Sequence, residues 1–345
     1  MSSELILKID QNSRNLDREQ DVSMQKNSFG ALGKVSRLTL GGGGIGQAWG
    51  ATSREEAIAT IRDAVDAGID LLDTAPLYRN CESIVAETFD GRLPAGLCVT
   101  TKCGLGSPEP GQVERALTQS LDASLAAMKL DHVDIFFLHS NICADDYVYA
   151  NRPDLQNSYA TRWTIYAEHV IPAMEKLKAA GKTRSWGITG SGVPDAIIRA
   201  LRHAKRPAYV QAVTNLLDSA GTLRRYAEPA RPREIIAVAQ EEGVAVLGIR
   251  AVQAGALTGQ VDRELTPNNP DRKDFERASP YRALCRELGQ DPAIVAHRYA
   301  LSLPGVATVI LGVKNREELR QCLEAEASGP LEPALMARID GLGLR

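Results

Sequence analysis

The sequence of 345 residues lacks the features that would place it in several specialised classes of protein. It has no excess of positive charge, because 40 lysines and arginines stand against 43 aspartates and glutamates, a formal net charge of -3. Proteins that bind nucleic acid or an anionic membrane surface normally carry a basic face. We therefore expect neither a nucleic-acid nor a membrane partner, and a small-molecule substrate instead.

Metal-site spacing and long apolar runs are missing as well. The six cysteines include no C-x-x-C pair, and none has metal-site spacing to the five histidines. No apolar run approaches the about 18 residues of a spanning helix, and the run at residues 5–7 is too short for a secretory signal. Unpaired thiols are normal in the reducing cytosol. These absences predict a cytoplasmic protein without a metal or a disulfide framework.

From Phe29 onward the chain begins with a short hairpin near residues 32–38 and then alternates strand-like and helix-like segments. Residues 1–28 are polar and aperiodic, and we interpret them as an extension with the composition of a disordered segment. Eight apolar runs read as buried strands: 38–40, 69–72, 97–102, 133–139, 183–188, 209–213, 244–249 and 308–311. Strands joined by helical crossovers lie parallel, and eight such units close a barrel. The sequence therefore predicts a single α/β domain, a (β/α)8 TIM barrel over residues 29–345.

Polar side chains follow three successive predicted strands. Asp73 and Tyr78 come after the second strand, Lys102 ends the third, and His139 ends the fourth. The carboxyl ends of barrel strands meet at one rim, where such barrels bind ligands. A tyrosine needs help to exchange protons near neutral pH, and a nearby ammonium held by a carboxylate would lower its pKa. Each residue alone has a structural explanation, but the four together indicate a proton-transfer site.

A glycine-rich turn precedes the first helix. Residues 41–46, Gly-Gly-Gly-Gly-Ile-Gly, match the pattern G-x-G-x-x-G of dinucleotide-binding folds. That pattern requires a helix on its last glycine and an acid about 20 residues later. Here the next helix start, the capping box of residues 53–56, comes late, and Asp73 lies further still. We interpret the run as a turn that allows a close backbone approach.

These segments resemble the aldo-keto reductase superfamily, in its bacterial type. The resemblance rests on Asp-Thr-Ala-x-x-Tyr at residues 73–78, Thr-Lys at 101–102 and Asp-Ile-Phe-Phe-Leu-His at 134–139, with further similar segments at 181–188, 255–259 and 304–312. It implies an NAD(P)-dependent oxidoreductase that interconverts a carbonyl and an alcohol by direct hydride transfer. Tyr78 would be the general acid/base, Lys102 and Asp73 would tune it, and His139 would position the substrate oxygen.

The resemblance also implies a set of cofactor contacts. Gly42, Gly43 and Asp73 would border the nicotinamide, and Thr189, Gly190 and Gln211 would meet its carboxamide. Many relatives have Ser-Asn where this chain has Thr189-Gly190, so one amide contact is missing or is supplied by Ser191. Ile249 would pack on the ring in place of a tyrosine, and Arg250 would pair with the pyrophosphate or with a neighbouring carboxylate.

The adenosine end of the cofactor would lie at residues 312–318. Gly312 opens this loop, Lys314 is placed to pair with a 2′-phosphate, and Arg316 would assist it. Glu318 opposes that assignment, because a carboxylate repels a phosphate and accepts a hydrogen bond from a ribose hydroxyl. We predict NADP as the cofactor, with NAD as the close alternative.

The substrate and the class of function are less narrowly defined. The long loop at 140–164 carries Tyr147, Tyr149 and Trp163, which predict an aromatic substrate pocket for an aldehyde, a ketone or a sugar. A sugar dehydrogenase working in the oxidative direction, or an accessory subunit that binds the cofactor with little turnover, stays open. A Schiff-base aldolase built on Lys102 is the rival chemistry, and Asp73 argues against it because a Schiff-base lysine needs a lowered pKa.

Overall fold

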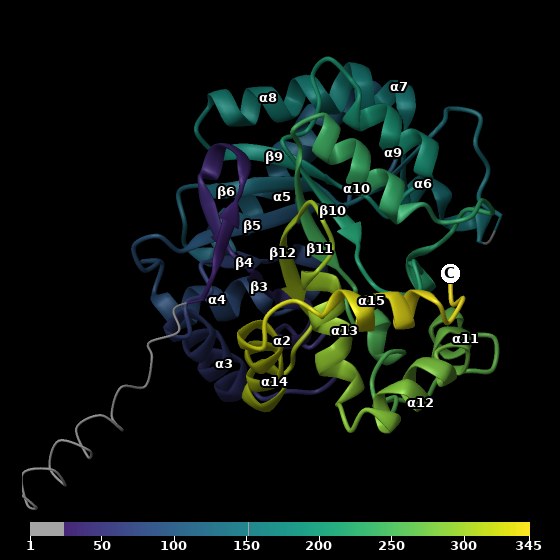
Figure 1. The fold of residues 1–345 in the computed structure, drawn as a ribbon. Helices are drawn as coiled ribbons and strands as arrows, with labels where there is room; N and C mark the ends of the chain where they lie inside the picture. The colour runs from purple at the N-terminus through teal and green to yellow at the C-terminus, as the bar shows by residue number, and fades with distance from the viewer. Residues whose placement is uncertain (1–23, 151) are drawn as a thin grey trace, which may run out of the picture.

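A closed barrel of eight parallel strands forms the centre of the protein. The computed structural model describes residues 24–150 and 152–345 (Figure 1). The strands are β3 (Leu38–Gly41), β4 (Leu71–Asp73), β5 (Cys98–Cys103), β6 (Val133–Leu138), β9 (Thr183–Thr189), β10 (Tyr209–Val213), β11 (Ala245–Ile249) and β12 (Val306–Leu311). They pair in chain order, and β12 closes the barrel against β3. The predicted barrel is confirmed, and each of the eight predicted runs contributes one strand.

The strands are apolar throughout because both of their faces are buried. All six residues of β6 are buried, and successive side chains point to opposite faces of the sheet. Ile135 and Phe137 pack inside the barrel with Leu71 and Leu247. Phe136 and Leu138 belong to the larger core. A continuous apolar run is therefore what this position in the fold requires.

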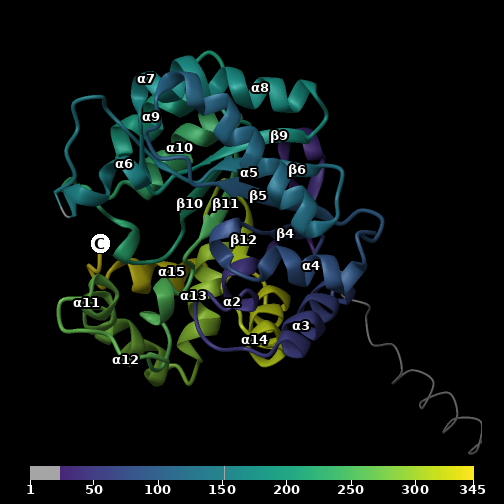
Figure 2. The ribbon, with the colours of Figure 1, turned by 180° about the vertical axis from the view of Figure 1, so that it is seen from behind.

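Helices surround the strands on all sides, as Figures 1 and 2 show from opposite directions. They are α3 (Arg54–Asp66), α4 (Cys81–Phe89), α5 (Val113–Met128), α8 (Ile171–Ala179), α9 (Pro194–Leu201), α10 (Pro232–Glu241), α12 (Ser279–Glu287), α13 (Pro292–Leu301), α14 (Arg316–Ala327) and α15 (Pro333–Asp340). Ser53 and Asn315 accept hydrogen bonds from the backbone N–H groups of Glu56 and Glu318, so the capping box predicted at residues 53–56 begins a helix, and Asn315 caps another.

A hairpin closes the amino-terminal end of the barrel. It pairs β1 (Lys26–Ser28) antiparallel with β2 (Lys34–Ser36), and Figure 1 shows it in purple beside the strands. Phe29 lies in the turn of this hairpin and packs on Tyr209 with ring centroids 4.7 Å apart. Residues 26–28 belong to this hairpin, so the predicted extension ended too late, while residues 1–23 lie outside the described chain. The open end of the barrel is the carboxyl rim.

The rim carries elements that the sequence did not indicate. The long connection after β6 holds β7 (Asn141–Cys143), α6 (Gln156–Tyr159), β8 (Ala160–Arg162), α7 (Trp163–Ile165) and the π-helical turn η5 (Tyr166–Val170). The glycine run forms the short helix α2 (Gly42–Ile45), and α11 (Pro270–Arg277) follows β11. Among the described residues, no helix is long and apolar enough to span a membrane, and no three His, Cys, Asp or Glu side chains are grouped as a metal site requires.

Candidate active site

A buried ion pair lies at the carboxyl ends of β4 and β5. Lys102 Nζ donates hydrogen bonds to Asp73 Oδ2 at 2.6 Å and to the backbone carbonyl of Thr74 at 2.9 Å. Both side chains are almost completely removed from solvent. Because an unpaired charge is costly in this environment, each residue depends on the other for its ionised form.

Asp73 is held by two further donors. Thr100 Oγ1, from the neighbouring strand, donates to Asp73 Oδ1 at 2.8 Å, and Gln211 Nε2 donates to the same oxygen at 2.6 Å. Gln211 lies on β10, which is on the opposite side of the barrel from β4, so this hydrogen bond crosses the interior. This hydrogen bond uses the Nε2 donor of Gln211, and a contact of its amide group with the nicotinamide stays a prediction. The role of Thr100 was not predicted, because a threonine inside a strand gives no signal of its own.

Lys102 stays charged in this setting. Burial pulls its pKa down, but the attraction of Asp73 and Tyr78 outweighs burial and leaves the pKa of Lys102 above its ordinary value. An amine must lose its proton before it can attack a carbonyl carbon. The geometry thus opposes the Schiff-base alternative.

Tyr78 packs on this pair from a 3₁₀ turn, η2 (Pro76–Tyr78), that begins directly after β4. Lys102 Nζ lies 4.5 Å from the centroid of the Tyr78 ring. The sequence predicted that this ammonium would lower the pKa of the phenol. Burial in fact raises the pKa of Tyr78 above its ordinary value, although Lys102 opposes the shift as expected. Tyr78 is therefore a neutral proton donor at neutral pH.

His139 follows β6 and completes the group. Its ring meets the Tyr78 ring edge to face, with centroids 5.8 Å apart and an angle of 86° between the planes. Burial, helped by the nearby Lys102 charge, lowers the pKa of His139 to about 3. The imidazole is consequently neutral at physiological pH and has one N–H to donate. The four residues named from sequence are thus brought together.

The glycine turn packs beneath a tryptophan that was not predicted as a site residue. Trp49 is 50% exposed, and its ring centroid lies 5.9 Å from that of Tyr78. A Cβ added to Gly43 would collide with the Trp49 indole, and one added to Gly42 would collide with Cys81 Sγ. These glycines are accounted for by packing within the protein, and their approach to a nicotinamide stays a prediction. The sequence signal that could have identified Trp49 as a site residue is its position as an aromatic residue in the loop after the first strand.

A buried polar cluster lies at the end of β9. Ser191 Oγ donates to Asn141 Oδ1 at 3.3 Å and lies 3.4 Å from Thr189 Oγ1. Gly190 N donates to the Gln211 carbonyl at 2.7 Å, and a Cβ at Gly190 would lie only 2.8 Å from that oxygen. The close approach of β10 explains why glycine occupies this position. Ser191 and Asn141 supply the side-chain polarity there.

Arg250 is committed to an internal ion pair. It follows Ile249, the last residue of β11, and its guanidinium contacts Asp271 of α11 at 2.7 Å and Gln253 Oε1 at 2.8 Å. Gln253 in turn donates to Asp274 at 2.6 Å. The predicted neighbouring carboxylate is Asp271, and a contact of Arg250 with the pyrophosphate stays a prediction. This network also explains α11, whose polar sequence attaches through carboxylates instead of an apolar stripe.

Carboxylates also surround the loop that was predicted to hold the adenosine. Lys314 Nζ pairs with Asp262 and with Glu318 Oε1, the latter at 3.2 Å. Arg316 pairs with Glu56 of α3 at 3.0 Å. The two cations proposed for a 2′-phosphate are therefore engaged within the protein. A Cβ added to Gly312 or Gly259 would meet nothing within 4 Å, so the backbone on this side of the rim is open. Open glycine edges beside buried polar strand ends fit an extended dinucleotide.

Comparison with known proteins decides the family. A family model described as the aldo/keto reductase family matches residues 37–343. The chain belongs to the aldo/keto reductase family. This confirms the resemblance and places the protein among oxidoreductases.

Relatives of this aldo/keto reductase share its length and fold. The chain is 26% identical to L-galactose dehydrogenase of Arabidopsis thaliana, covering 88% of this chain and 89% of the relative. It is 27% identical to the NADH-specific methylglyoxal reductase of Escherichia coli (strain K12), covering 79% and 81%. An aldo-keto reductase structure from Bacillus halodurans superimposes with a TM-score of 0.67 at 23% identity over 92% of this chain and 96% of the other. That last similarity supports the fold alone.

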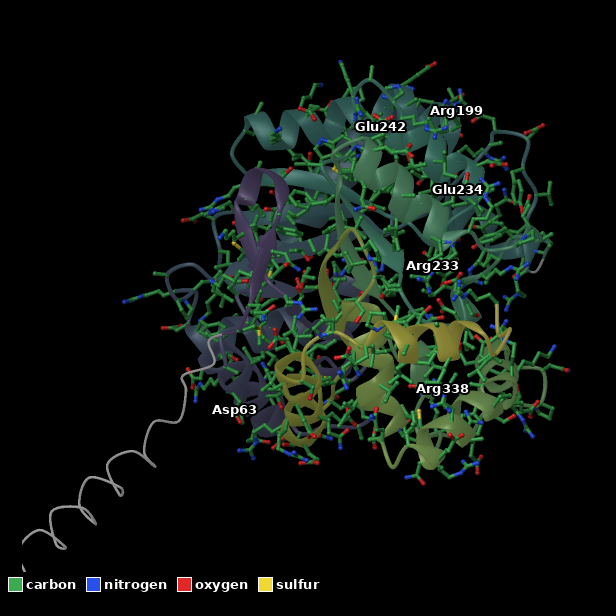
Figure 3. All side chains as sticks on the ribbon, viewed as in Figure 1. Asp63, Arg199, Arg233, Glu234, Glu242 and Arg338 are labelled. Carbon is green, nitrogen blue, oxygen red and sulfur yellow. The ribbon has the colours of Figure 1, made fainter. Side chains whose placement is uncertain are left out.

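The aromatic residues predicted for the substrate pocket are distributed differently. Tyr147 and Tyr149 pack edge to face, 6.3 Å apart, in the loop after β7, and Tyr147 donates to Glu228 of the loop after β10. Trp163 begins α7 and is 8% exposed beneath the guanidinium of Arg199, which Figure 3 labels on α9 in the outer helical layer. Trp163 therefore lies against α9 in the outer helical layer, and its place in the substrate pocket stays a prediction. The two tyrosines stay candidates.

The ion pair between Arg250 and Asp271 generates a stability prediction. We expect Asp271→Ala to lower the free energy of unfolding by about 3 kcal/mol, because it leaves the Arg250 guanidinium, whose side chain is only 14% exposed, without its carboxylate. The matched control is Glu287→Ala, which removes the partner of Arg338; the side chains of the arginine and the glutamate are 49% and 66% exposed. That change should cost less than about 1 kcal/mol in denaturant unfolding. Equal losses would contradict a stabilising network behind the rim.

The lowered pKa of His139 generates a pH prediction. Since the unfolded chain protonates this histidine near pH 6.5 and the folded protein only near pH 3, the group favours unfolding as the pH falls below 6.5. His139→Gln should therefore lose less unfolding free energy than the wild type between pH 6.5 and 4. The exposed His132→Gln should follow the wild-type curve, and buried His297 is present in all three proteins. A wild-type pH dependence in His139→Gln would show that His139 titrates normally.

Proposed function

We propose that this aldo/keto reductase interconverts a small carbonyl compound and the corresponding alcohol with NAD(P), using Tyr78 as general acid and base. The observation that carries the proposal is the stacking of a neutral, partly buried phenol on the Lys102–Asp73 pair, with a neutral imidazole at its edge. Lys102 as an ammonium and Tyr78 as a neutral phenol are poor nucleophiles in these ionisation states. Each is suited to moving or holding one proton.

The side chains divide the work of reduction between them. The Tyr78 hydroxyl gives its proton to the carbonyl oxygen, and the phenolate that remains is stabilised by the ammonium of Lys102. The neutral His139 ring donates its N–H to the same oxygen and orients the carbonyl. A bound nicotinamide supplies the hydride to the carbonyl carbon in this direction and accepts it in the reverse. Asp73 keeps Lys102 protonated throughout.

The substrate class rests on the relatives and on the shape of the rim. The relatives include a sugar dehydrogenase and a methylglyoxal reductase, so we propose a small aldehyde, ketone or sugar. The exposed indole of Trp49, beside Tyr78, offers a flat apolar face to the carbon skeleton of such a compound. The Lys102 charge state disfavours the aldolase alternative. Turnover in the following experiment would exclude a purely accessory role.

The proposal is tested by Tyr78→Phe, which removes the transferable proton and keeps the ring on Lys102. We expect kcat to fall by about 100-fold to 10,000-fold, the usual contribution of a positioned acid, with cofactor affinity changed less than about threefold. Turnover is followed by nicotinamide absorbance with panels of aldehydes, ketones and aldoses. The control is Tyr166→Phe, because the buried Tyr166 hydroxyl has no hydrogen-bond partner within residues 24–150 and 152–345. Full turnover by Tyr78→Phe would refute the assigned role.

A further inference from the structure

The positively charged side chains in and just after the loop that follows β12 are paired with carboxylates. The segment 312–318 contains Lys314 and runs into α14, which begins at Arg316 and carries Arg320 in its second turn. Each of these three cations is paired with at least one carboxylate. A phosphate group arriving at this loop would therefore have to displace a carboxylate before it could pair with any of them.

Lys314 is the most strongly engaged. Its ammonium contacts Asp262, from the segment after β11, and Glu318, from the first turn of α14, and its side chain is only 18% exposed. Arg263 also pairs with Asp262, at 2.9 Å. The hydrogen bond from Lys314 outweighs burial and holds the pKa of Asp262 below its ordinary value, so this carboxylate is ionised at neutral pH. The ammonium therefore lies between two negative charges.

Glu318 is fixed in this position by the backbone. Its Oε2 accepts a hydrogen bond from Lys314 N at 2.9 Å while its Oε1 pairs with the Lys314 ammonium. Its own N–H donates to the Asn315 side chain at 2.9 Å, which anchors the residue in the first turn of α14. If this carboxylate moves away from an incoming anion, it loses both its hydrogen bond from Lys314 N and its ion pair with the Lys314 ammonium.

Arg316 is engaged in a different direction. Glu56 of α3 accepts from Arg316 Nη2 at 3.0 Å, from Nε at 3.2 Å and from the backbone N–H at 2.9 Å. This bidentate pair ties the start of α14 to α3 and orients the guanidinium toward a carboxylate already present. The second cation that the sequence offered to a phosphate is thus also occupied.

We propose that this loop selects a dinucleotide with a free 2′-hydroxyl, NAD(H), over the 2′-phosphorylated NADP(H). The inference rests on the proposed function and reverses the sequence prediction of NADP. A ribose hydroxyl can donate a hydrogen bond to Glu318 or Asp262 and leaves the Lys314 pairs intact. A 2′-phosphate would place two further negative charges against these carboxylates, and their repulsion cancels the attraction of Lys314.

The test measures binding directly and does not require turnover. The full-length protein is titrated with NADH and with NADPH, and binding is followed by tryptophan quenching and by isothermal calorimetry. We expect the Kd for NADPH to exceed that for NADH by about tenfold or more. A wild-type protein that binds NADPH as tightly as NADH, or more tightly, overturns the inference.

Variants identify the residues responsible. In Asp262→Asn with Glu318→Gln, the Lys314 ammonium loses both negative partners, so the ratio of the NADPH Kd to the NADH Kd should fall by about tenfold, mainly through tighter NADPH binding. The matched control is Glu317→Gln, the neighbouring glutamate in the same helical turn, which pairs with exposed Arg320. That ratio should stay within about twofold of the wild type. An unchanged ratio in the double variant overturns the assignment to these carboxylates.

The outcomes separate this inference from the proposed function. If neither dinucleotide binds at millimolar concentration, the proposed function itself fails, and the inference fails with it. If NADPH binds better and Tyr78→Phe still abolishes turnover, the proposed function stands and only the cofactor preference is wrong. Circular dichroism and thermal unfolding of each variant establish that the measured differences come from folded protein.

Discussion

The ion pair between Lys102 and Asp73 is the interaction on which the rest of the site depends. It lies inside the barrel, away from solvent, where removing one partner leaves the other as an uncompensated charge. Thr100 and Gln211 donate hydrogen bonds to the second oxygen of the Asp73 carboxylate, so both of its oxygens are hydrogen-bonded. The barrel thereby presents Tyr78 with a cation whose position is set by contacts from three strands, β4, β5 and β10.

Ion pairs also connect the segments that form the rim. Arg250, Lys314 and Arg316, for which the sequence predicted contacts with a dinucleotide, are each paired with a carboxylate from a different segment of the chain. These pairs join α11 to the end of β11, the segment after β11 to the start of α14, and α14 to α3. These three cations, which the sequence offered to a ligand, connect segments of the rim through their ion pairs. The backbone and the polar strand ends are then the groups left to contact a ligand.

Local signals in the chain were sufficient for the barrel. Each strand is a short apolar run, and helices such as α3, α13 and α14 begin at a capping side chain, so the alternation of strands and helices indicated the topology. The elements that were missed lack a clear apolar period, although α11 begins at the capping residue Asn269. The helix α2 is made largely of glycine, α11 has no apolar stripe, and the strands β7 and β8 lie in a loop where three residues each give too short a pattern.

The sequence by itself determined the fold, the family and the four residues at the strand ends, because these depend on residue order along single strands and on the parallel arrangement of neighbours. Only the tertiary structure decided which partner each charged or aromatic residue meets. Gln211 reaches Asp73 across the barrel, Trp163 turns to the outer layer, and Lys314 is enclosed by Asp262. Lys314 and Asp262 are 52 residues apart in the sequence, and Gln211 and Asp73 are 138 residues apart. Closure of the barrel is what brings these pairs together.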